Sequence, residues 1–168
     1  MEQRRKERRA ILRRQVTCGR LVLLAIVVLS LINQLLLMLG VEYHFWISAA
    51  VPYYLNWFCV QTGAALGWRI LAGLAAVGLL AAYIFCMVLS LRKREWMTLC
   101  LGLYGLDTVL LAIFSFTLLE NPASCLLEIC VHIGCALLMF IADQAAGQLS
   151  RMRRKPRRVI REREEAYE

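Results

Sequence analysis

The chain has 168 residues, of which 60% are apolar, and its formal net charge is +8. A soluble domain is typically about 45–50% apolar, so this composition argues against an ordinary soluble fold. It also argues against a nucleic-acid-binding arm, because no aromatic residues alternate with the basic ones at the N-terminus, as binding to single strands would favour.

Four long apolar runs predict membrane-spanning helices. Two runs, 21–39 and 70–91, contain no charge, whereas 96–119 contains only Asp107 and 123–142 only Glu128. About 20 apolar residues cross roughly 30 Å of hydrocarbon. We therefore expect an all-α membrane protein, a four-transmembrane-helix bundle with spans at about 21–40, 69–91, 96–119 and 123–145. This membrane domain, 21–149, lies between a basic segment, 1–20, and a charged tail, 150–168.

The N-terminal segment carries eight basic residues and lacks helix breakers, so it predicts a helix at the inner membrane surface. Anionic lipid is its expected partner, because each basic residue near such a surface contributes about 1 kcal/mol. The first apolar run is too long for a signal peptide, and no small-x-small cleavage site closely follows it.

The charge distribution predicts the orientation. If all four runs span, 19 of the 20 basic residues lie on one side and only Arg69 on the other. The positive-inside rule then places both termini and the loop at 92–94 in the cytoplasm. A three-span arrangement would put the Arg-rich tail outside, against the rule.

The outer connection, 41–68, is rich in aromatic residues. Its Trp and Tyr side chains favour the lipid headgroup level, and Pro52 argues against one uninterrupted helix. We expect an interfacial or shallow re-entrant segment whose rings form an aromatic belt or line the mouth of a lipid or apolar-ligand site. The candidate residues are Tyr43, Trp46, Tyr53, Tyr54 and Trp57.

Three ionisable residues, Asp107, Glu128 and His132, lie inside the last two apolar runs, 96–119 and 123–142. A short turn at 120–124 makes these spans antiparallel neighbours, and the rise of about 1.5 Å per residue sets Asp107 within a turn of His132. Glu128 and His132 are four residues apart and share a helix face. That face forms one stripe, which predicts burial against other helices: Cys125, Glu128, His132, Cys135, Met139 and Ala142.

Three interpretations of Asp107, Glu128 and His132 stay open. They could form a hydrogen-bonded network that fixes helix register, or titrate as relay groups of a proton or ion path. They could also bind a transition metal with a thiol of Cys125 or Cys135, although Glu-x-x-x-His is a weak signal. No catalytic motif, phosphate-binding glycine run or cofactor signature occurs, and the seven cysteines predict no disulfide framework. We therefore expect no enzyme activity.

The layout resembles a group of small four-span integral membrane proteins of Gram-positive gut bacteria, for which no function is established. The resemblance rests on the basic N-terminus, "FWISAAVPYYL" (45–55), "LRKREWM", "LDTVLL" and a His in the fourth span before a basic tail. It implies a bacterial plasma membrane location and directs attention to Pro52, Asp107 and His132. We expect a non-enzymatic membrane module that packs with itself or a larger membrane complex. The alternative is a small proton-coupled or ion-conducting transporter.

Overall fold

The computed structural model describes residues 2–41, 43–91, 93–118 and 123–165, in which it has five α-helices and no strand. Side chains are described in these ranges except at 2, 118, 123 and 124 and from 153 onward. The helices are α1 (Glu2–Met38), α2 (Ala50–Gln61), α3 (Leu66–Ser90), α4 (Arg94–Leu118) and α5 (Ala123–Glu165). The predicted all-α fold is therefore confirmed for this part of the chain.

Four of the helices are long and apolar enough to cross a membrane, as predicted. The qualifying segments are Gln3–Met38, Leu66–Ser90, Arg94–Thr117 and Cys125–Met152. Helices α1 and α5 are longer than the predicted spans, with 37 and 43 residues, because the charged segments continue them without a break. The predicted turn at 120–124 lies largely outside the described residues.

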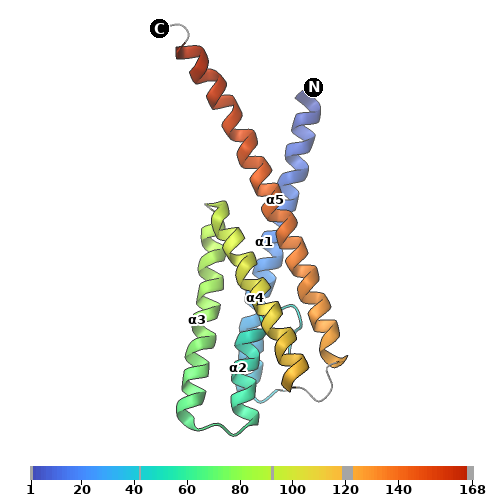
Figure 1. Ribbon diagram of the computed structural model, residues 1–168, viewed down its shortest axis with the longest axis vertical. Helices are drawn as coiled ribbons and strands as arrows, with labels where there is room; N and C mark the ends of the chain where they lie inside the picture. The colour runs from blue at the N-terminus through green and yellow to red at the C-terminus, as the bar shows by residue number, and fades with distance from the viewer. Residues whose placement is uncertain (1, 42, 92, 119–122, 166–168) are drawn as a thin grey trace.

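The helices cross so that both chain ends lie at the same end of the bundle (Figure 1). Helices α1 and α5 make the most extensive contact, and α4 packs against α3 and α5. A Cβ atom on Gly19 of α1 would overlap the side chain of Ala142 on α5. This crossing therefore needs the glycine, because the two backbones approach too closely for any side chain there.

The shortest helix, α2, packs against α1, α3 and α4 beside the half of α3 that lies away from the chain ends (Figure 1). Gly40 and Gly63 have φ angles of 72° and 62°, a left-handed conformation that glycine adopts without strain, and they follow α1 and α2. Pro52 is the third residue of α2, where it lacks only an N–H that the first turn would not use. The proline therefore begins a helix instead of breaking one.

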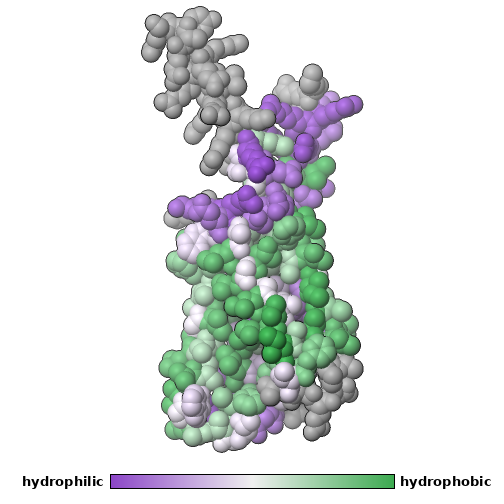
Figure 2. Space-filling view, viewed as in Figure 1, coloured by the Kyte–Doolittle hydropathy of each residue, from purple (hydrophilic) through white to green (hydrophobic). Residues whose placement is uncertain are grey.

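The interior combines apolar side chains with small and polar ones. The main cluster joins α1, α3, α4 and α5, and its buried members include Leu23, Ile26, Tyr83, Tyr104 and Met139. None of the seven cysteines forms a disulfide, and four of them, Cys86, Cys100, Cys125 and Cys135, are buried as small core residues. Figure 2 shows an apolar surface over most of the bundle and hydrophilic residues gathered towards the end that carries both termini.

Candidate functional site

The first turn of α2 lies inside the bundle, where its backbone N–H groups cannot reach water. The first four N–H groups of any helix have no partner within the helix. Here Ala49 donates to Oγ of Ser30 at 2.7 Å, Ala50 to Oδ2 of Asp107 at 2.8 Å and Val51 to Oδ1 of Asp107 at 2.9 Å. The next residue is Pro52, which has no N–H. All donors of the turn are thereby satisfied.

Asp107 thus caps α2 from another helix. The carboxylate lies on α4, is 4% exposed, and offers one oxygen to each of two successive N–H groups. A negative charge at a helix N-terminus is favourable, because the helix dipole places partial positive charge there. This explains why a carboxylate stands in an otherwise apolar helix.

His132 of α5 lies on the other side of the same carboxylate. Its Nδ1 is 3.0 Å from the backbone oxygen of Glu128, and a carbonyl oxygen only accepts, so Nδ1 carries hydrogen. Its Nε2 lies 3.6 Å from Oδ2 of Asp107. This contact is favourable only when a proton lies between Nε2 and Oδ2, since two lone pairs would otherwise face each other. The ring of Tyr104 stacks on the imidazole at 5.2 Å between centroids.

Glu128 forms a second centre one turn along α5. Its Oε2 accepts a hydrogen bond of 2.8 Å from the Tyr54 hydroxyl and lies 3.5 Å from Nε2 of His44. Burial, and then the neighbouring Glu128, raise the pKa of Tyr54, so the phenol keeps the proton that it donates. The imidazole of His44 stacks on Tyr53 at 4.6 Å. Glu128 therefore ties α5 to α2 and the segment before it.

Polar residues of α1 bind the segment that precedes α2, residues 43–49, and they were not among the predicted site residues. The Asn33 side chain accepts from the Phe45 N–H at 2.8 Å and donates to the Phe45 oxygen at 2.9 Å. It also donates to the Ser48 hydroxyl, which donates in turn to Phe45. Ser30 and Asn33 are three residues apart, a spacing that puts both on one face of α1 and could have revealed them.

The structure brings Asp107, Glu128 and His132 into one polar cluster around the start of α2. The cluster contains Ser30, Asn33, His44, Ser48, Tyr54, Tyr104, Asp107, Glu128 and His132. The predicted stripe of α5 is buried at all six positions, with at most 8% exposure. Its polar members face other helices, as the spacing predicted.

The aromatic residues of the segment predicted to lie on the outer side divide into two groups. Tyr43 and Trp46 are exposed, at 63% and 44%, as a surface belt requires. Tyr53 and Tyr54 were expected beside them but are buried, because α2 turns these rings into the bundle against Leu111 and Phe114. Trp57 is half-buried and packs against the same cluster.

A further buried carboxylate, Asp143 of α5, was also missed. Arg94 donates to both of its oxygens, at 3.1 and 2.7 Å, and Thr98 donates to Oδ1 at 2.9 Å. It stands just beyond the apolar run 123–142, although inside the predicted span at 123–145, and it was not counted among the candidate residues. The ion pair instead joins α4 to α5 near the end that carries the termini.

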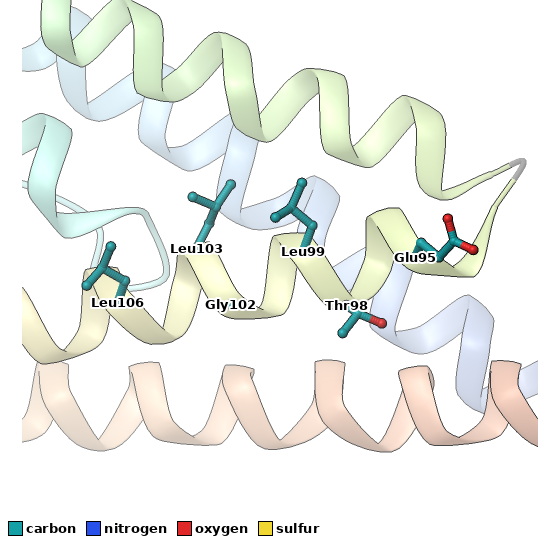
Figure 3. A pocket seen from close by; sticks show the side chains of 6 residues that line it. All are labelled: Glu95, Thr98, Leu99, Gly102, Leu103 and Leu106. Carbon is teal, nitrogen blue, oxygen red and sulfur yellow. The ribbon is translucent and has the colours of Figure 1, made fainter.

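The cluster offers little to a metal or a substrate. Among the described residues, no group of three or more His, Cys, Asp or Glu side chains could hold a metal ion. Of three surface hollows in the described part of the chain, one of about 360 Å³ is lined by Tyr54 of the cluster, whereas Asp107, Glu128 and His132 line none of the three. Another hollow, of about 600 Å³, follows a single face of α4 from Glu95 to Leu106 (Figure 3).

No family model, curated protein or solved structure matches the chain.

Proposed function

We propose that this chain is a non-enzymatic membrane module of the bacterial plasma membrane that packs with itself or with a larger membrane complex. The observation that carries the proposal is the use of Asp107. Its two oxygens accept hydrogen bonds from the backbone of α2, so this buried carboxylate acts as a helix cap. In this proposal the polar cluster locks α2, a half-length re-entrant helix, into the four-span bundle.

Burial around the cluster supports a structural role. Asp107, Glu128 and His132 are at most 4% exposed, and none of them lines the three surface hollows, although Tyr54, which donates to Glu128, lines one of them. Ion or substrate passage needs a wet route to groups that change partners, whereas a lock needs dry and fixed partners. The Ser48 and Ser115 hydroxyls donate to backbone oxygens.

Purification of the chain in native-lipid particles tests whether it packs with itself or with a larger membrane complex. Mass analysis of co-purifying proteins, lipids and metals should show a second copy or another membrane protein in stoichiometric amount. A strictly single, metal-free chain would overturn the module hypothesis.

The orientation is part of the proposal, with both termini and the 92–94 loop in the cytoplasm. It is supported by the 19 basic residues of the chain that belong to one side and by the shared end of the two termini (Figure 1). Anionic lipid is the proposed partner at that end. Single-cysteine variants that keep Cys18 or Cys59 test the orientation with a membrane-impermeant maleimide. On intact cells only Cys59 should react, and labelling of Cys18 from outside would reverse the assignment.

A small proton-coupled or ion-conducting transporter is the second candidate, and one observation favours it. Glu128 Oε1 and His132 Nε2 are buried without a hydrogen-bond partner in the described part of the chain. Glu128 also lies 3.5 Å from His44, whose side chain is 20% exposed. These groups would begin a proton path from the surface to Asp107.

Proteoliposomes carrying an internal pH-sensitive dye distinguish the two candidates. Under an imposed potential, the lock predicts the same proton leak for wild-type protein and Glu128→Gln as for empty vesicles. A wild-type flux that Glu128→Gln abolishes would replace the lock by the transporter.

A further inference from the structure

A groove lies between α1, α2 and α3 in the half of the bundle that contains α2. Its volume is about 620 Å³. It exists because α2, with 12 residues, stands between the ends of two much longer helices and fills only part of the space between them. Its walls are mostly aliphatic, from Leu31, Leu35 and Met38 on α1 to Val77 and Leu80 on α3.

Two amide side chains line this groove and interrupt its apolar wall. Asn56 Nδ2 donates to Gln34 Oε1 at 2.8 Å, which links α2 to α1. Gln34 Nε2 is buried and has no hydrogen-bond partner among the described residues. Gln34 and Asn56 both line the groove, so their side chains are the polar groups that the ester region of a lipid would meet there.

Arg69 lies where the groove meets the end of the bundle. Its side chain lines the groove, is exposed, and donates through Nε to the Ala64 oxygen at 2.9 Å. It is the one basic residue that the sequence places on this side of the four spans. The guanidinium fork suits a phosphate, to which it can donate two parallel hydrogen bonds.

The spacing of these groups along α3 follows the layers of one lipid leaflet. Arg69 and Gly73, which faces Asn56, are about 6 Å apart along the helix, and Leu80 is about 10 Å further. The headgroup and interfacial layer of a leaflet is about 5–8 Å thick. A phosphate at Arg69 thus sets a glycerol ester at the Gln34–Asn56 pair and an acyl chain beside Leu80.

We propose that this groove is a binding site for one anionic glycerophospholipid of the outer leaflet. Arg69 binds the phosphate, the amide pair binds the ester region, and the aliphatic walls of α1 and α3 hold an acyl chain. The inference rests on the proposed orientation in the bilayer, but not on the role of the Asp107 cluster.

Native mass spectrometry of the full chain in mild detergent, with equal amounts of phosphatidylglycerol and phosphatidylcholine added, tests the site. Wild-type protein should retain one phosphatidylglycerol with about fivefold preference, the effect of one basic residue near an anionic headgroup. Arg69→Gln should bind both lipids equally. Gly73→Leu should lose the retained lipid, because its side chain would extend into the groove, where only Asn56 Oδ1 lies as near as 4.0 Å.

Gly78→Leu is the matched control, since it adds the same side chain to α3 at an exposed position with no atom within 4 Å of the new Cβ. It should bind lipid like wild-type protein. Equal retention of the two lipids by wild-type protein, or equal retention by Gly73→Leu and Gly78→Leu, would mean annular lipid only and overturn the site. Arg69 is exposed, so its variant decides the matter even if Gly73→Leu does not fold. Maleimide labelling separately reports a failure of the orientation.

Discussion

Two buried aspartates, one near the middle of α4 and one on α5 near the end that carries the termini, are stabilised in different ways. Asp107 and Asp143 are each 4% exposed. Asp143 is bound by side chains, the Arg94 guanidinium and the Thr98 hydroxyl. Asp107 is bound by the backbone of α2 and by the buried imidazole of His132.

The difference lies in what each carboxylate leaves behind when it is removed. The Arg94 side chain is 40% exposed, so without Asp143 it can turn to water or headgroups. The N–H groups of Ala50 and Val51 are fixed at the start of α2, and His132 is wholly buried, so without Asp107 they have no alternative partner. A buried carboxylate is thus hardest to replace where its partners cannot move.

The largest expected effect is that of Asp107→Ala. It should lower the unfolding free energy by about 3–5 kcal/mol, the range for breaking a buried charged pair by removing one partner. Asp143→Ala, the matched variant, should lower it by only about 1–2 kcal/mol, because Arg94 can be rehydrated. Reversible denaturation in mild detergent, followed by circular dichroism, measures both. Equal losses would refute the contrast between fixed and mobile partners.

The close approach of two buried side chains, Asp107 and His132, predicts strong coupling between them. In a double-mutant cycle with Asp107→Asn and His132→Ala, the interaction free energy should be about 1–3 kcal/mol. The parallel cycle of Asp143→Asn with Arg94→Ala should give less than about 1 kcal/mol, as solvent-accessible pairs do. Additive losses at Asp107 and His132 would show that the two side chains do not interact.

The sequence predicted the helices better than the contacts of the cluster. The length and apolarity of the runs locate four spans. The rise per residue along two helices joined by a short turn predicts that Asp107 lies near His132, and His132 Nε2 is 3.6 Å from Asp107 Oδ2. These results depend on periodicity within one or two helices. Such periodicity is a property of the local sequence, and it is therefore readable without a structure.

The role of Asp107 could not be read in the same way. Its main partners are backbone N–H groups of Ala50 and Val51, more than 50 residues away, and backbone atoms leave no trace in residue types. The burial of Tyr53 and Tyr54 depends likewise on the tertiary path of 41–49, because the same rings would suit a membrane surface. Asp143 was missed because its partner, Arg94, looked like part of a basic loop.

A smaller effect is expected where α1 crosses α5, in the region of the bundle that contains Asp143. Gly19→Ala should lower the unfolding free energy by about 1–3 kcal/mol, since the new Cβ overlaps Ala142 and forces the helices apart. Gly102→Ala, with no atom within 4 Å of its Cβ, is the control, and it should be stabilising by up to about 1 kcal/mol. Similar values for the two variants would mean that the crossing tolerates a wider separation.

The last comparison removes one hydroxyl donor from a buried carboxylate in each region. Thr98→Val should have the smallest effect and lower the unfolding free energy by about 1 kcal/mol, because Asp143 keeps two bonds from Arg94. Tyr54→Phe should lower it by about 1–3 kcal/mol, because Glu128 then keeps only the 3.5 Å contact with His44 and its Oε1 already lacks a partner. The denaturation assay ranks the two variants. A larger loss for Thr98→Val would mean that water replaces the Tyr54 hydroxyl at Glu128, which would weaken the lock and favour the proton path.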